Sequence, residues 1–172
     1  MRSTLISLGL VANATLGLFS VGAQANCVAN PPTQSNTTFP ASLTGKLAYH
    51  SYASYGDGTS QIFIYDFSAR TLQQVSNAAW GIKDPMNAVF SPDGKWIAYM
   101  SMESGLPEVW VASFPEFADR RKIGEGTAPL WRADGREIVY VDSSSSLAHV
   151  TVTPGPNPVF SAPERLIEVS AF

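Results

Sequence analysis

Ser-Pro-Asp-Gly-Lys-Trp-Ile-Ala-Tyr, residues 91–99, is the stretch that decides the fold of this chain. An Asp-Gly pair suits a tight hairpin, because glycine takes a positive φ without steric cost and the aspartate carboxylate accepts hydrogen bonds from nearby backbone N–H groups. The apolar residues that follow do not alternate with polar ones, so both faces of this strand are expected to be covered. We therefore assign Asp93 and Gly94 to a structural turn.

The same arrangement recurs 41 residues later as Arg-Ala-Asp-Gly-Arg-Glu-Ile-Val-Tyr at 132–140, where Asp134 and Gly135 are assigned to a second structural turn. A weaker copy, Gly-Lys-Leu-Ala-Tyr at 45–49, lacks the preceding aspartate. A turn and strand repeated along a chain indicate stacked sheets, because one small sheet cannot bury both of its faces alone.

Further strand segments follow each copy of the repeat. They are rich in β-branched and aromatic residues at 61–67, 107–113 and 147–152, and more polar at 71–76, 120–123 and 164–169. Four strands in a unit of about 40 residues is typical of a propeller blade. The sequence thus predicts an all-β fold of three four-stranded β-propeller blades, at about 45–77, 86–124 and 127–169. The first blade lacks its inner strand.

Residues 89–101 together with 103–111 resemble the repeat of TolB-type propellers, also called the WD40-like or PD40 repeat. Residues 127–142 and the segments after them resemble propeller blades appended to some bacterial kinases and regulators. The resemblance covers residues 45–168. It implies a non-catalytic module that binds a protein partner in the cell envelope, without a cofactor or a metal.

Three blades are too few for a closed ring, because propellers close with about four to eight. Two open faces and unpaired strand edges would remain. Either two chains associate as a homo-oligomer that completes the propeller, or N-terminal residues add structure, or the chain is a truncated remnant of a larger protein.

The N-terminal residues are typical of an export signal. Arg2 supplies the positive start, residues 5–21 are apolar, and Ala-Gln-Ala at 23–25 suits cleavage. We expect a signal peptide at 1–25, a disordered leader at 26–44, no stable membrane span after cleavage, and a periplasmic or secreted protein. Cys27 is the single cysteine, so no disulfide can form within the chain; acylation is disfavoured because the residues before it do not follow the lipoprotein pattern.

Composition and motifs argue against several function classes. A net charge of −3 and the lack of a basic stripe give no reason to expect nucleic acid. No Gly-x-Ser-x-Gly elbow is present, and His50 and His149 have no neighbours at metal-ligand spacing. Residues 120–122 are interpreted as a solvated outer strand and 124–126 as a connector. The residues therefore favour a binding module over an enzyme, with no catalytic, cofactor or metal site assigned.

Loops between strands and between blades are expected to gather at the end opposite the Asp-Gly turns, where varied loops on a rigid scaffold usually bind ligands. These loops are 51–60, 78–85, 102–106, 124–127 and 143–146. Tyr52, Tyr55 and Asp57 make the first of them the candidate binding loop, because aromatic residues among small ones suit contact with a peptide or sugar. A plain surface loop is the alternative, and Trp80 is either exposed in its connector or a core plug.

A second function class stays open. PD40 propellers also resemble oligogalacturonate lyases and the gating domains of prolyl-oligopeptidase-type peptidases, so the alternative is a carbohydrate- or peptide-processing propeller. Lyases of that kind use several histidines around a metal, and this chain has two histidines. A peptidase would need a hydrolase domain, and no hydrolase motif is found here.

Overall fold

The structure is a computed structural model that describes residues 42–54 and 56–167. The expected signal peptide at 1–25, Cys27 and most of the expected leader lie outside the described residues. The described part is built from antiparallel strands and one short 3-10 helix, η1 (Ala78–Trp80). The strands are β1 (Lys46–Ser51), β2 (Gln61–Asp66), β3 (Thr71–Gln74), β4 (Met86–Phe90), β5 (Trp96–Ser101), β6 (Glu108–Ser113), β7 (Arg121–Trp131), β8 (Glu137–Asp142), β9 (Leu147–Thr153), β10 (Val159–Phe160) and β11 (Glu164–Ile167).

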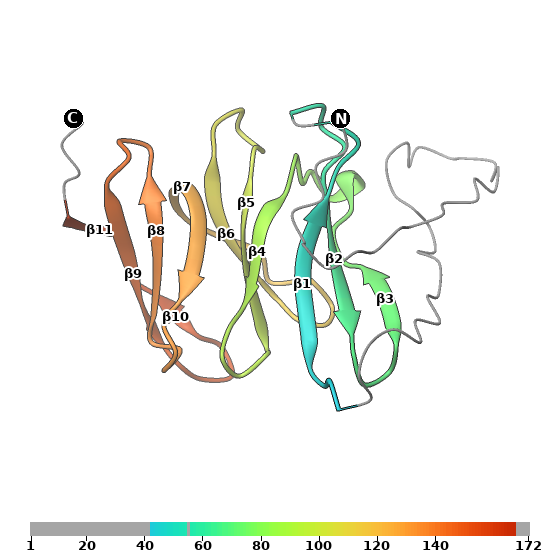
Figure 1. Cartoon of the computed structure of the whole chain (residues 1–172). Helices are drawn as coiled ribbons and strands as arrows, with labels where there is room; N and C mark the ends of the chain where they lie inside the picture. The colour runs from blue at the N-terminus through green and yellow to red at the C-terminus, as the bar shows by residue number, and fades with distance from the viewer. Residues whose placement is uncertain (1–41, 55, 168–172) are drawn as a thin grey trace.

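The sheets stand side by side across the molecule (Figure 1). The first sheet has the order β1-β2-β3. The other eight strands are connected, with β4 to β10 paired in chain order and β11 paired with β9. This second order is continuous because β7 pairs with β6 through residues 121–125 and with β8 through residues 126–131. We call β4, β5, β6 and 121–125 the second sheet, and 126–131, β8, β9, β10 and β11 the third.

The bend in β7 depends on glycine. Gly126 has a φ of 149°, and a Cβ on it would lie 2.1 Å from the carbonyl oxygen of Val141. A Cβ on Gly124 would lie 2.1 Å from the hydroxyl of Tyr140. The sequence prediction of a loop at 124–127 is therefore wrong, because these residues run within a strand that passes from one sheet to the next.

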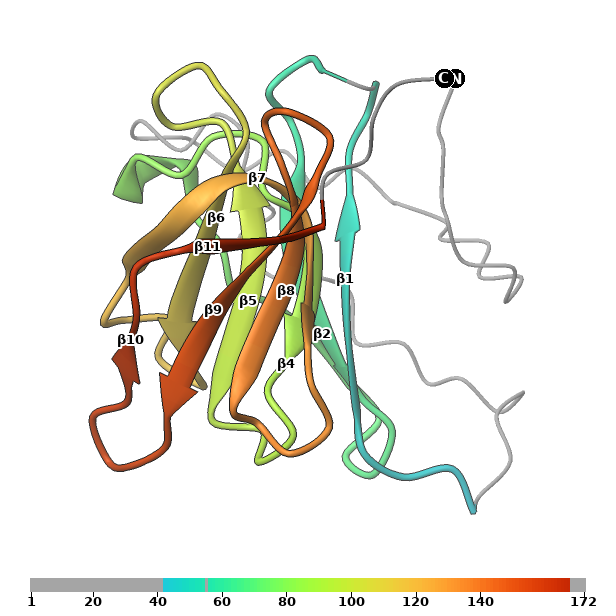
Figure 2. The same cartoon turned by 90° about the vertical axis from the view of Figure 1, so that its left-hand side faces the viewer.

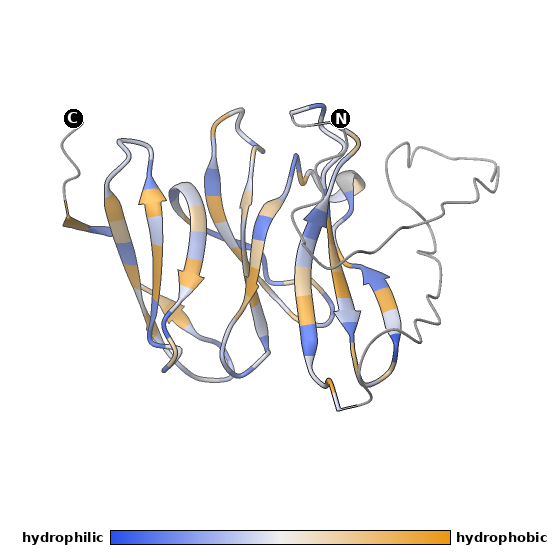
Figure 3. Cartoon of the chain, in the orientation of Figure 1, coloured by the Kyte–Doolittle hydropathy of each residue, from blue (hydrophilic) through white to orange (hydrophobic). Residues whose placement is uncertain are grey.

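Side chains between the sheets form two hydrophobic clusters. Ile97 and Tyr99 point into the cluster between the first and second sheets, whereas Trp96 and Ala98 point into the cluster between the second and third. All six residues of β5 are buried. The prediction that both faces of this strand are covered is thus confirmed, and the all-β, propeller-type stacking of sheets follows from it. Figure 2 views the stack from the side of β9 and β11, and Figure 3 shows the hydrophobic residues concentrated in the strands.

Candidate functional site

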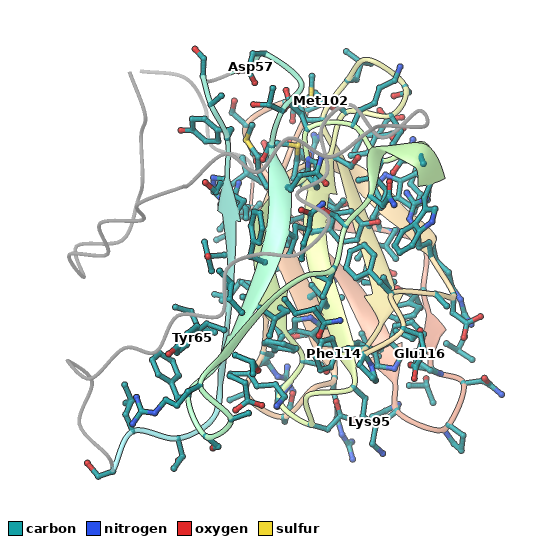
Figure 4. All side chains as sticks on the ribbon, turned by 90° about the vertical axis from the view of Figure 1, so that its right-hand side faces the viewer. Asp57, Tyr65, Lys95, Met102, Phe114 and Glu116 are labelled. Atoms are coloured by element: carbon teal, nitrogen blue, oxygen red, sulfur yellow. The ribbon has the colours of Figure 1, made fainter. Side chains whose placement is uncertain are left out.

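Loops of all three sheets meet at one end of the strands, which we call the loop end; the opposite end, with the Asp-Gly turns, is the turn end. The connections 52–60, 75–85, 102–107 and 143–146 lie at the loop end (Figure 1). Figure 4 places Asp57 and Met102 at this end and Lys95 and Phe114 at the other. The loop end is thus where the sequence led us to look for binding.

Asp57 organises the candidate binding loop. Its carboxylate accepts hydrogen bonds from the backbone N–H groups of Ser54 and Thr59, at 2.7 and 2.8 Å, and from the hydroxyl of Thr59, at 2.5 Å. The hydroxyl hydrogen bond from Thr59 contributes most to lowering the pKa of Asp57. Because these bonds occupy the carboxylate, the contribution of Asp57 is to hold the loop in shape.

Tyr52 follows β1 directly, and its ring is half-buried. It stacks on the imidazole of His50, with ring centroids 5.7 Å apart and planes at 21°. Tyr55, the second aromatic residue of the candidate loop, lies outside the described residues. The loop therefore offers an aromatic surface that is anchored to the end of a strand.

His50 joins this aromatic pair to the second sheet. Burial lowers the pKa of His50, so its ring is neutral at pH 7 and its Nδ1 can accept a hydrogen bond. The backbone N–H of Asn87 donates to this atom at 3.3 Å. Asn87 has a φ of 53° at an irregularity in the pairing of β4 with β5, where its N–H leaves the ladder. His50 thus acts as a packed side chain that also caps a bulge.

Asn87 continues the connection to the third sheet. Its Nδ2 donates to the hydroxyl of Thr127 at 3.2 Å. His50, Asn87 and Thr127 therefore bring together the first, second and third sheets at the loop end. The sequence analysis did not identify Asn87, and it included Thr127 only as part of the expected loop at 124–127. Asn87 lies 41 residues before Ala128, which has the same φ of 53°, and asparagine is one of the few residues that tolerate it.

The two Asp-Gly turns are structural in detail. Asp93 accepts hydrogen bonds from the Lys95 N–H at 3.1 Å and from the Ser91 hydroxyl at 2.6 Å. Burial alone would raise the pKa of Asp93, but these hydrogen bonds outweigh it and the pKa is lowered. Gly94 has a φ of 69°, as the turn requires.

The second turn adds an ion pair. Asp134 accepts hydrogen bonds from the Arg136 N–H at 3.0 Å and from Arg132, whose side chain is the main cause of a pKa of about 2 for Asp134. Gly135 has a φ of 70°. Both carboxylates thus satisfy their own turns at the turn end, away from the candidate loop.

The interpretation of residues 120–122 as a solvated strand is wrong for Arg120. Its side chain is 18% exposed. It donates to the Tyr99 hydroxyl at 2.9 Å and to the Trp80 carbonyl at 3.1 Å, and forms an ion pair with Glu103. The guanidinium also lies 4.9 Å from the centre of the Trp110 ring. Trp80 itself is 50% exposed and so is not a core plug.

The described residues contain no group of three or more His, Cys, Asp or Glu side chains that could hold a metal ion. His149 lies 3.2 Å from a carboxylate oxygen of Glu137 and 3.8 Å from one of Glu164, on the outer side of the third sheet. Within residues 42–54 and 56–167, no helix is long and apolar enough to cross a membrane. The groups that meet at the loop end are the aromatic rings of His50 and Tyr52, the amide of Asn87 and the hydroxyl of Thr127.

No protein-family model matches the sequence, and no curated protein is similar to it. Solved structures give partial matches to β-propellers. TolB from Acinetobacter baumannii is 21% identical, with a TM-score of 0.47, over 69% of this chain and 30% of that chain. The β-propeller domain of the Trilobed protease from Pyrococcus furiosus is 19% identical, with a TM-score of 0.49, over 73% of this chain and 41% of that one.

An oligogalacturonate lyase in complex with manganese is 18% identical, with a TM-score of 0.40, over 60% of this chain and 33% of the lyase. The chain thus spans less than half the length of these structures. The assignment to propeller-type sheets rests on the strand order and on the two-sided burial of β5 described above.

Proposed function

We propose that this chain is an exported, non-catalytic β-propeller module that binds a protein partner in the cell envelope through its loop end. One observation supports this proposal above the others: His50, Asn87 and Thr127 tie three sheets together beside the aromatic pair of His50 and Tyr52. A rigid base beneath an aromatic loop lowers the entropic cost of binding, because fewer groups must be ordered on contact.

The candidate loop is tested by capture of partners from an envelope fraction of the host. The purified protein is immobilised, and retained proteins are quantified for the wild type and for a double variant, Tyr52→Ala with Tyr55→Ala. We expect partner retention to fall by about tenfold or more, since aromatic side chains carry much of the binding energy at interfaces. A thermal unfolding curve must show that the double variant is still folded at the temperature of the capture experiment.

Glu116→Ala provides the matched control, because Glu116 is exposed and lies at the turn end (Figure 4). Its capture should equal that of the wild type. Capture by the double variant equal to that of the wild type would contradict the assignment of the site to this loop.

Two further experiments test the rest of the proposal. Fractionation of the host should find the protein in the periplasm or the medium. Bound divalent metal together with turnover of a polyuronate would instead favour a carbohydrate-processing enzyme.

A further inference from the structure

A cavity of about 600 Å³ opens between the outer strands of the second and third sheets. Residues 122–125 of β7 line one side of it, and residues 163–165 at the start of β11 line the other. β8 and β9 add Tyr140, Asp142 and Ala148. Figure 2 shows β7, β8, β9 and β11 from this side of the molecule. The lining lies outside the candidate binding loop and the Asp-Gly turns, so the cavity is a separate feature.

Tyr140 brings a hydroxyl group to this cavity from the interior. The residue is 2% exposed, and it belongs to the hydrophobic cluster between the second and third sheets. Its hydroxyl lies against Gly124, where a Cβ would be 2.1 Å away, and both residues line the cavity. Within the part of the chain that the structure describes, this hydroxyl has no hydrogen-bond partner. A buried polar group of this kind calls for a partner, and the cavity is where one can reach it.

The two cations of the lining are already paired. The Lys122 ammonium donates to Glu108 at 2.8 Å and to Glu125 at 3.3 Å. The Arg165 guanidinium donates to Asp142 at 3.2 Å. These side chains therefore balance carboxylates of the protein, and they offer little to an anionic ligand.

Hydrogen-bond acceptors remain at the cavity. A carboxylate has about four lone-pair sites, and Glu125 uses one of them for Lys122. Glu164 lies 3.8 Å from His149, which is beyond hydrogen-bond distance. Burial is the main cause of a raised pKa of the Tyr140 hydroxyl, and the charges of Asp142 and Glu125 add to it. Because carboxylates outnumber cations here, the lining suits a ligand that is positively charged and donates hydrogen bonds.

The rest of the lining suits an organic cation. Among the residues that the structure describes, no three His, Cys, Asp or Glu side chains are grouped closely enough to hold a metal ion. Ile123, Ala148 and Pro163 also line the cavity, and their apolar surface can pack against a chain of methylene groups. An ammonium group at the end of an alkyl chain combines both properties.

We propose that this cavity binds a primary alkylammonium group, which donates to the Tyr140 hydroxyl and to the carboxylates of Glu125 and Glu164. Such a group is found on a lysine side chain of a peptide and on a free polyamine, and these two sources share the same chemistry. The site goes beyond the proposed protein binding at the loop end and does not depend on it.

The probes are Nα-acetyl-lysine amide, for a lysine in a peptide, and cadaverine, for a free diamine. Nα-acetyl-norleucine amide is the matched control ligand, because it keeps the alkyl chain and lacks the ammonium group. Binding to the purified full chain is followed by NMR with isotope-labelled tyrosine rings, and the signal of Tyr140 is assigned by its loss in Tyr140→Phe. We expect both amines to shift this signal to saturation, and the norleucine compound to bind at least tenfold more weakly.

Two variants test the lining. Tyr140→Phe keeps the ring and removes the hydroxyl, and it should weaken amine binding by about tenfold, because a hydrogen bond to a charged group is lost. Its thermal midpoint should not fall below that of the wild type, since the hydroxyl has no partner in the described structure. Glu164→Gln should also weaken binding. Glu116→Gln is its matched control, because Glu116 is exposed at the turn end (Figure 4), and its amine binding should equal that of the wild type.

The outcomes separate the ligand sources and the hypotheses. Tighter binding of cadaverine would support a free polyamine as the ligand, and tighter binding of the lysine compound would support a peptide. Equal binding of the norleucine compound, or unchanged amine binding by Tyr140→Phe and Glu164→Gln, would overturn the inference. The double variant Tyr52→Ala with Tyr55→Ala should bind amines as the wild type does, so loss of partner capture in that variant leaves this site untouched.

Discussion

Aspartate side chains hold a loop or a turn in shape at both ends of this molecule, and we assign them no catalytic role at either end. Asp57 holds the candidate loop through bonds from Ser54 and Thr59, and Asp134 holds a hairpin through Arg132 and Arg136. In each case short-range geometry explains the carboxylate, so aspartates in turns carry little information on function here. The residues that join the sheets are the neutral ones, His50 and Asn87.

The lowered pKa of Asp134 leads to a prediction on pH. Its folded-state pKa is about 2, below the value of 3.8 for an unperturbed carboxyl, mainly because of Arg132. A depressed pKa contributes stability that is present above the unfolded pKa and is lost as pH falls through the folded one. We expect the thermal midpoint to fall between about pH 4 and pH 2, and Asp134→Asn to reduce this slope while lowering the midpoint at pH 7. An unchanged slope in the variant, measured by scanning calorimetry, would contradict this account.

At the scale of elements, β7 decides how the second and third sheets meet. It is eleven residues long and serves as the outer strand of one sheet and the inner strand of the next. Its bend at Gly126 brings that backbone against Val141. The position of the third sheet, and with it Thr127 at the loop end, depends on this bend.

Gly126→Ala tests this role. A Cβ would lie 2.1 Å from the Val141 carbonyl oxygen at a φ of 149°, and both the clash and the backbone conformation oppose it. We expect a loss of more than about 2 kcal/mol in the free energy of unfolding, measured by urea titration. Gly155→Ala is the control, because a Cβ there meets nothing within 4 Å and should change stability by less than about 0.5 kcal/mol. Equal stabilities of the two variants would show that β7 tolerates a different bend.

How far the sequence predicts these elements depends on the range of the interactions. The positive φ of Gly94 and Gly135 and the burial of β5 on both faces depend on residues that are close together in the sequence. The continuous path of β7 and the buried position of Arg120 were not predicted, because both depend on residues that are distant in sequence. The contact of Asn87 with Thr127 spans forty positions and could be found only once the sheets were placed.

At the scale of the whole molecule, the two outer faces of the stack differ. Tyr49 and Phe63 stack on the outer face of the first sheet, with centroids 5.6 Å apart. The outer face of the third sheet carries His149 between Glu137 and Glu164. His149 pairs with Val139 as Val111 pairs with Ala98, so a polar residue takes the position of one that is buried in the second sheet.

This difference sharpens the prediction that two chains complete a propeller. In such a ring the aromatic outer face of one chain meets the polar outer face of the other, and taking the charged groups of that polar face out of water costs free energy. We therefore expect self-association that is weaker than the packing between sheets within a chain and that depends on concentration. Light scattering after size exclusion should show a mass rising from one copy toward two, and Phe63→Lys should keep the protein at one copy. Lys95→Ala, at the turn end (Figure 4), should leave the mass profile unchanged. A wild-type mass of one copy at every concentration would rule out ring closure by a second chain.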